Sequence, residues 1–259
     1  MTMALKTQNI PSRQTVVASF GEFPAPFKMG LIVLSSDMVL ERDFGLMMPP
    51  CGEVAFYSSR VHYPGTVDEE SLRLMGPLLA EAASTILPTS KLDVIAYGCT
   101  SASVLIGPEE VASQILEGRP DVTVVTPISA AIAAFKSQNV RRISLMTPYT
   151  RNITQTMANF IEAQGIEVLN FAYFDLVDDQ EIAKLTPDRI HDAALEISHP
   201  EADAVFLSCT GVRSVETIGR LETSLGKRAF CSNQCMFWQS LRLSGYTKPI
   251  SGFGQLLMT

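Results

Sequence analysis

The feature that most constrains the fold is a repeated pattern, in which an apolar run ends in a cysteine and a threonine. DVIAYGCTSASV (93–104) aligns with AVFLSCTGVRSV (204–215), so Cys99 and Cys209 lie 110 positions apart. Since each run has the length and β-branched content of a buried strand, each Cys-Thr pair falls at the end of a strand. The repeat predicts an internal duplication of a unit of about 110 residues.

A second pair of strand ends has nearly the same spacing. Ser36 ends LIVLSS 63 positions before Cys99, and Thr147 ends the strand run ISLMT of ISLMTPYT 62 positions before Cys209. Elsewhere, short runs rich in Val, Ile and Leu alternate with segments of helical period, which is typical of parallel sheets covered by helices. The expected strands include MGLIVLS, EVAFYSS, LDVIAYG, VTVVT, RRISLMT, IEVLNFA and ADAVFLS. The expected helices cover about 69–86, 108–117, 129–137, 151–164, 187–197, 213–225 and 234–243.

The predicted fold class is therefore α/β, with two pseudo-symmetric Rossmann-like lobes and the active site in the cleft between them. Residues 1–27, with three prolines and no sustained period, are expected to form an irregular N-terminal arm. Lobe 1 is expected to comprise residues 28–127 with about 232–259, and lobe 2 residues 128–231. In parallel α/β sheets ligands bind beyond the carboxyl ends of the strands, where both Cys-Thr pairs fall.

Charge and composition exclude several classes of partner. The net charge of −7, with lysines and arginines scattered singly, provides no basic patch for nucleic acid. No apolar run approaches the roughly 20 residues that span a bilayer, and the first 25 residues lack the apolar core of a signal peptide, so we expect a cytoplasmic protein without a membrane partner. Five cysteines at irregular spacing argue against a disulfide framework and for reduced thiols.

Two such thiols can perform proton transfer without a cofactor. Free amides at the start of the following helix favour a carboxylate, and the same helix end is expected to lower the pKa of the cysteine. With Cys99 and Cys209 on opposite faces of one carbon, one removes a proton and the other returns it. No metal, flavin or pyridoxal group is then required. The alternative is that both cysteines are buried small hydrophobes, although the duplicated context favours function.

The remaining candidates are weaker. Cys231 and Cys235 lack partner ligands and are expected to be structural, Cys51 lies in a loop, and no metal site is predicted. Histidines are dispersed, and no phosphate-binding loop, GxSxG or HExxH motif occurs. Tyr149, in TPYT, follows a strand end, and its hydroxyl is placed to bond a carboxylate, while Thr150 is a candidate helix cap.

A two-lobed chain with GCTS in one lobe and SCTG in the other resembles the aspartate/glutamate racemase superfamily, in the branch of maleate isomerase and arylmalonate decarboxylase. The resemblance covers nearly everything from Lys28 onward. Within the branch, SSDMVLERDF, DVIAYGCTSASV, RRISLMTPYT, SCTGVRSVE and SGYTKPISGFGQLL most resemble the ectoine-utilisation members.

The resemblance implies that Cys99 and Cys209 are the two catalytic cysteines. It also implies that a small carboxylate substrate is held by residues near the strand ends, which are Ser35, Ser36, Asp37, Thr100, Ser101, Tyr149, Thr210 and Gly211. The decarboxylases have glycine at the first cysteine, so the presence of Cys99 disfavours decarboxylation. Maleate isomerases typically have SSN where this chain has Ser35, Ser36 and Asp37. Because an aspartate repels a second carboxylate and attracts a cation, an amino-acid derivative fits better than a dicarboxylate.

Three functions follow. The first is a cofactor-independent racemase or epimerase acting alpha to a carboxylate, on an amino-acid derivative in ectoine or hydroxyectoine utilisation. The second is a maleate-type cis-trans isomerase with a covalent cysteine adduct. The third is a carboxylate-binding protein without turnover. The resemblance also implies a homodimer or higher homo-oligomer.

Overall fold

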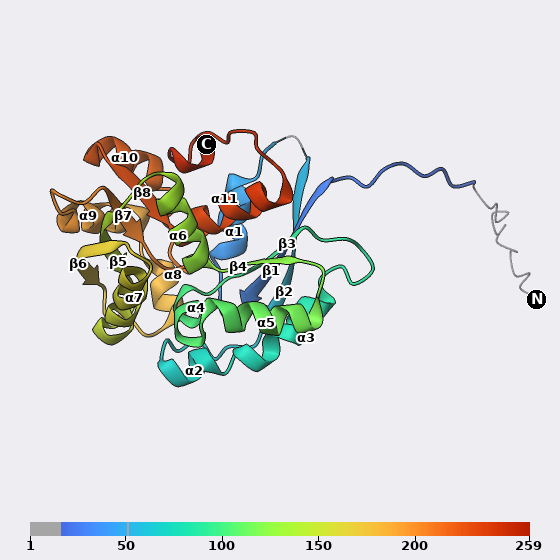
Figure 1. Ribbon diagram of the computed structural model, residues 1–259, viewed down its shortest axis with the longest axis horizontal. Coiled ribbons are helices and arrows are strands. Elements are labelled where there is room, and N and C mark those ends of the chain that lie inside the picture. The colour runs from blue at the N-terminus through green and yellow to red at the C-terminus, as the bar shows by residue number, and fades with distance from the viewer. Residues whose placement is uncertain (1–16, 51) are drawn as a thin grey trace, which may run out of the picture.

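The computed structural model describes residues 17–50 and 52–259 (Figure 1). Most of the expected N-terminal arm, residues 1–16, and Cys51 lie outside the described residues. Residues 17–26 contain no helix or strand and extend away from the body of the molecule (Figure 1). Within them Val17, Phe20 and Phe23 are exposed, and the first strand begins at Phe27.

Two four-stranded, wholly parallel sheets form the framework, and they share one strand order. The first has the order β2-β1-β3-β4 and the second the order β6-β5-β7-β8. The strands are β1 Phe27–Leu34, β2 Val54–Val61, β3 Val94–Tyr97, β4 Thr123–Val125, β5 Arg142–Thr147, β6 Glu167–Tyr173, β7 Ala204–Leu207 and β8 Arg228–Cys231. Since β3 and β7 begin 110 residues apart, the sheets repeat at the spacing of the cysteines. The predicted fold class is confirmed.

Helices flank both sheets (Figure 1). They are α1 Leu40–Met47, α2 Glu69–Arg73, η1 Gly76–Leu78, α3 Leu79–Thr85, α4 Thr100–Ile106, α5 Pro108–Gly118, α6 Pro127–Ser137, α7 Arg151–Ala163, α8 Asp179–Lys184, α9 Pro187–Ile197, α10 Ile218–Leu225, α11 Ser232–Ser244 and η2 Leu256–Met258. The helix expected over 69–86 is divided around Pro77, whose ring and missing N–H disrupt a continuous helix. The helix expected from about 213 begins only at Ile218, because residues 211–217 form successive turns.

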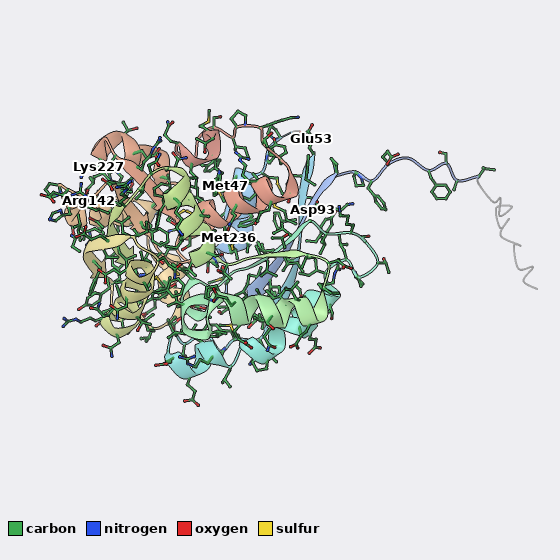
Figure 2. The ribbon with its side chains drawn as sticks, in the orientation of Figure 1. Met47, Glu53, Asp93, Arg142, Lys227 and Met236 are labelled. Atoms are coloured by element: carbon green, nitrogen blue, oxygen red, sulfur yellow. The ribbon has the colours of Figure 1, made fainter. Side chains whose placement is uncertain are left out.

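The two sheets are joined through a shared apolar core. Phe135 of α6 packs edge-on against Phe206 of β7 and Phe230 of β8, so α6 covers the second sheet. Helix α11 contacts β1, β3 and α6, and it carries Met236, which is fully buried at the centre of the molecule (Figure 2). We therefore propose 28–127 with about 232–259 as one lobe and 128–231 as the other.

Polar contacts between the lobes hold the two cysteine loops together. The hydroxyl of Thr210, which follows Cys209, donates to the carbonyl of Gly98, which precedes Cys99, at 3.1 Å. Asn233 of α11 donates to the carbonyl of Thr210 at 2.9 Å and to Asp43 at 2.8 Å. Because all of these groups are buried, the relative position of the two strand ends is fixed by bonds that water does not weaken.

Replacing Thr210 with valine tests this contact. The change keeps the volume but leaves the buried Gly98 carbonyl without that donor, and we expect a loss of about 1–3 kcal/mol in the free energy of unfolding. Urea denaturation followed by fluorescence measures it. Thr210→Ser keeps the hydroxyl and is the matched control; an equal loss in both variants would show that the methyl group, not the hydrogen bond, matters.

Candidate active site

The two predicted cysteines line one pocket. Strand β3 ends at Tyr97 and β7 at Leu207, and in each lobe the cysteine follows two residues later. Both side chains are buried, at 5% and 6% exposure. The pocket is lined by Leu34, Asp37, Met38, Tyr63, Val67, Leu72, Cys99, Ser101, Tyr149, Asp179, Ala183, Cys209, Thr210 and Gly211. The duplication therefore brings a thiol from each lobe to the same cavity.

Gly98 explains one residue of the YGCTS motif. Its N–H donates to the carbonyl of Ile32 at 2.8 Å, which brings the chain close to β1. A Cβ at this position would lie 2.1 Å from Cδ2 of Leu40 and 3.1 Å from the Ile32 oxygen. Only glycine fits there without displacing the loop that carries Cys99.

Polar groups from both lobes surround the two thiols. The Cys99 sulfur lies 3.6 Å from the Ser101 hydroxyl, and the amide of Gly211 donates to the Cys209 sulfur at 3.3 Å. The Tyr149 side chain lies close to Cys209 and Ser101, and its hydroxyl lowers the pKa of Cys209 against the larger effect of burial. Ser101 and Tyr149 therefore bridge the two sides of the pocket and present hydroxyl donors between the thiols.

The thiols are protonated in the closed pocket, contrary to the expectation that a helix end lowers their pKa. Burial raises the pKa of Cys99 to about 12 and that of Cys209 further. Hydrogen bonds from Ala102 and Ser101 oppose the shift at Cys99 but do not outweigh it. At Cys209 no helix follows directly, since α10 begins nine residues later at Ile218. Desolvation therefore dominates over the helix end at both positions.

Five of the eight predicted substrate-binding residues line the pocket, namely Asp37, Ser101, Tyr149, Thr210 and Gly211. The other three face elsewhere. The Ser35 hydroxyl donates to the carbonyl of Tyr63 and accepts from its amide, which joins the ends of β1 and β2. Ser36 donates to Asp179 at 2.5 Å, and Thr100 donates to Ser232 at 3.0 Å. These three side chains support the walls of the pocket without lining it.

Two polar lining residues were missed from the sequence, Tyr63 and Asp179. The Tyr63 hydroxyl donates to the carbonyl of Thr66 at 2.6 Å, so its ring is fixed. Asp179 is the first residue of α8, and its position carried a signal: Val-Asp-Glu at 67–69 recurs as Val-Asp-Asp at 177–179, again 110 residues apart. Extending the 110-residue alignment from the strands to the loops that follow them would have identified Asp179 as a candidate.

The two copies of this motif pair with each other across the lobes. The amide of Val67 donates to the carbonyl of Val177 at 2.7 Å, and the amide of Asp179 donates to the carbonyl of Gly65 at 3.1 Å. Thr66 and Asp178 form an antiparallel bridge between them. We call this pairing of 65–67 with 177–179 the interlobe bridge. With it formed, the free volume of the pocket is about 20 Å³, room for about one water molecule.

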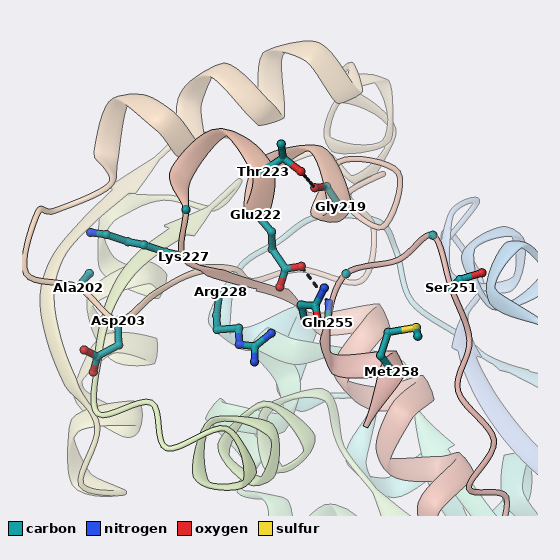
Figure 3. Close-up of a pocket in the computed structure, with 13 residues that line it drawn as sticks. Ala202, Asp203, Gly219, Glu222, Thr223, Lys227, Arg228, Ser251, Gln255 and Met258 are labelled. Atoms are coloured by element: carbon teal, nitrogen blue, oxygen red, sulfur yellow. Dashed lines mark hydrogen bonds between the residues drawn. The ribbon is translucent and has the colours of Figure 1, made fainter.

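A wider hollow of about 810 Å³ lies between α10 and the C-terminal segment (Figure 3). Its ionisable side chains are largely engaged: Lys227 donates to two backbone carbonyls, and Glu222 accepts from the amide of Gln255. No cysteine or histidine is among its described lining residues. We therefore place the chemistry in the smaller pocket between the lobes.

Other expectations concern residues outside the pocket. Cys231 and Cys235 are fully buried near the start of α11, and burial raises the pKa of Cys231 to about 12. Over residues 17–50 and 52–259, no three His, Cys, Asp or Glu side chains are grouped to hold a metal ion. Within the same residues, every helix is too short or too polar to cross a bilayer.

Comparisons with known proteins agree with this architecture. The arylmalonate decarboxylase family profile matches residues 78–257. A maleate isomerase from Alcaligenes faecalis is 25% identical over 245 residues, 89% of this chain and 96% of that protein. An arylmalonate decarboxylase from Bordetella bronchiseptica is 25% identical over 149 residues, 56% of this chain and 61% of that protein.

Solved structures show the same fold. Maleate isomerase Iso from Pseudomonas putida S16 superposes with a TM-score of 0.82 at 22% identity, over 90% of this chain and 98% of that chain. A mutant of the Nocardia farcinica maleate cis-trans isomerase with a covalently bound succinylcysteine intermediate gives 0.83 at 22% identity over the same shares. The relatives whose sequences align over nearly their whole length are maleate isomerases, which confirms the predicted enzyme class. Because the family profile matches more than half of this chain, the chain belongs to the arylmalonate decarboxylase family.

Proposed function

We propose that the chain is a cofactor-independent racemase or epimerase in which Cys99 and Cys209 transfer a proton at a carbon alpha to a carboxylate. One observation carries the proposal: two buried thiols, supplied by equivalent strand ends of the two lobes, line one pocket. A substrate carbon between them is accessible from both faces, which is what inversion requires.

The steps balance without a cofactor. One cysteine, as thiolate, removes the alpha proton, and the electron pair of the C–H bond moves into the carboxylate to give an enediolate. The other cysteine, as thiol, then donates its proton to the opposite face of the carbon. The Tyr149 and Ser101 hydroxyls and the Gly211 amide are placed to donate hydrogen bonds to the carboxylate as its charge increases.

A cis-trans isomerase is the second candidate, and a specific observation favours it. The relatives whose sequences align over nearly full length are maleate isomerases, and one related structure holds a succinylcysteine intermediate. In that reaction a thiolate adds to one alkene carbon, the remaining single bond rotates, and the thiolate leaves again. The carboxyl group of Asp37 in the pocket disfavours a substrate with two carboxylates, which is why we place racemisation first.

The substrate class and assembly are proposed on narrower grounds. Asp37 supports an amino-acid derivative, and the motifs quoted above support a role in ectoine or hydroxyectoine utilisation. The exposed Val17, Phe20 and Phe23 on the extended segment support a homodimer or higher homo-oligomer in which a neighbouring copy covers them. A cytoplasmic location stays a prediction from the sequence.

Proton NMR in heavy water tests the reaction with chiral amino acids, diaminobutyrates and maleate. Replacing either Cys99 or Cys209 with serine is expected to slow enantiomer interconversion by about 10²–10⁴-fold. Each single variant retains alpha-proton exchange only with the enantiomer whose face the remaining thiol serves. Cys235→Ala removes a buried thiol outside the pocket and is expected to leave turnover unchanged.

Other results of that experiment separate the alternatives. Fumarate formed from maleate, with a mass adduct on one cysteine and no alpha exchange, would establish the cis-trans isomerase. Unchanged biological function in the Cys99→Ser, Cys209→Ser double variant would favour a carboxylate-binding protein without turnover.

The raised thiol pKa predicts how the enzyme without substrate reacts with iodoacetamide. Below a pKa of about 12 the thiolate fraction of Cys99 rises tenfold per pH unit. We therefore expect its alkylation rate, followed by peptide mass spectrometry, to rise about tenfold per unit from about pH 7 to pH 10. The urea-unfolded protein, with thiols near their ordinary pKa of about 8.5, is the control. A plateau for Cys99 below about pH 9 in the folded protein would contradict the assignment.

A further inference from the structure

We propose that Asp37 and Asp179, one from each lobe, form a cation-binding pair that selects substrates carrying a protonated nitrogen besides the carboxylate. The inference rests on the proposed function in that it uses the same pocket. It goes further by naming Asp179 as a specificity-determining residue and by linking recognition of the cation to the acidity of the thiols.

Both carboxyl groups reach the pocket with one oxygen uncommitted. Oδ1 of Asp37 accepts hydrogen bonds from the amides of Val39 and Leu40, at 2.7 and 2.9 Å. Oδ2 of Asp179 accepts from Ser36. Within the described part of the chain, no residue donates a hydrogen bond to the other oxygen of either carboxyl group. Asp37 is only 8% exposed, and neither aspartate has an oxygen among the buried unpaired polar atoms of the described residues, so each free oxygen stays accessible to a group that enters the pocket.

The pocket lining supplies acids but no base. Of the described lining residues, the ionisable ones are the two aspartates, two cysteines and two tyrosines, and none is a lysine, arginine or histidine. Arg60, whose charge lowers the pKa of Asp37, donates to the backbone carbonyl of Asp37 and pairs with Glu41 outside the pocket. A bound ammonium or amidinium would be the first positive charge in the cavity.

The negative charge of the two aspartates also raises the pKa of the thiols. Burial raises the pKa of Asp37 to about 6 and that of Asp179 above its ordinary value, and each of the two aspartates raises the pKa of both Cys99 and Cys209. Asp179 adds to the shift of the Asp37 pKa, whereas Arg60 opposes it. Asp37 in turn raises the pKa of the buried Asp43 on α1. A cation between the carboxylates would offset their effect, so the correct substrate makes the thiols more acidic when it binds.

Asp179 reaches this position through the interlobe bridge. Its amide donates to Gly65 and its carboxyl accepts from Ser36, both in the other lobe. Its exposed neighbour Asp178 caps α8 by accepting from Gln180. The corresponding residue of the first lobe, Glu69, pairs with Arg73 at the surface. Both copies of the repeat therefore have an acidic residue at this position, but only Asp179 lines the pocket.

Protection of the thiols from iodoacetamide tests the pair without requiring turnover. The probes are four isosteric acids: 2,4-diaminobutyrate, homoserine, 4-amino-2-hydroxybutyrate and 2,4-dihydroxybutyrate, which carry two, one, one and no ammonium groups. We expect 2,4-diaminobutyrate to protect Cys99 and Cys209 at a concentration at least about tenfold below that of the dihydroxy acid. The two singly charged probes identify which nitrogen is bound.

Asp179→Asn is expected to reduce that discrimination at least about tenfold and to leave protection by 2,4-dihydroxybutyrate unchanged. It can still accept from Ser36, and a thermal melt verifies the fold. Without a ligand, its thiols should alkylate faster than wild type at pH 8, because one carboxylate that raises their pKa is gone. Asp37→Asn should act in the same direction. Asp175→Asn, an exposed residue with positive φ that asparagine tolerates, is the matched control.

Two results would overturn the proposal: equal protection by 2,4-dihydroxybutyrate or maleate in the wild type, or unchanged discrimination in both Asp37→Asn and Asp179→Asn. These outcomes are separate from failure of the proposed reaction. Cation-dependent protection without alpha-proton exchange would keep the recognition pair and remove the racemase. Alpha-proton exchange without a preference for cationic ligands would keep the racemase and remove the recognition pair.

Discussion

The hydrogen bond from the Thr210 hydroxyl to the Gly98 carbonyl is the contact on which the geometry of the site depends. It joins the residue after one cysteine to the residue before the other. Strand order alone brings the two strand ends to the same cleft, but it does not fix their spacing. Asn233, which bonds both Thr210 and the buried Asp43, anchors the same loop from α11. The sheets therefore bring both thiols to the cleft, and a small buried network sets the spacing between their loops.

The site combines duplicated parts with parts that have diverged. Cys99 and Cys209 occupy matching positions in the two lobes, as a reaction on both faces of a carbon requires. The hydroxyl of Tyr149 and the carboxyl groups of Asp37 and Asp179 have no matching residues in the pocket lining of the opposite lobe. A substrate with different groups at its two ends fits such a pocket better than a symmetric one.

The sequence predicted whatever follows from the repeat and from hydrophobic periodicity: both parallel sheets, the convergence of Cys99 and Cys209, and Tyr149 in the same pocket. It could not predict the direction in which a side chain turns within a loop. Thr100 faces Ser232 instead of the pocket because the helix that begins there rotates successive residues away from each other. The predicted lowering of the thiol pKa was also wrong. A strand-end motif does not reveal how completely the opposite lobe excludes water from the cysteine, and this burial raises the pKa.

The interlobe bridge also has a consequence for timing. The pocket behind it has free volume of about 20 Å³, far less than a small organic acid occupies. An organic acid can therefore bind beside the thiols only after the pocket enlarges, and we expect this enlargement to separate the lobes and break the backbone bonds at Val67 and Asp179. Such domain movements take microseconds to milliseconds. In the proposed racemase reaction, the dwell time of each product would then be set by separation of the lobes, and several reversals of configuration would occur before one release.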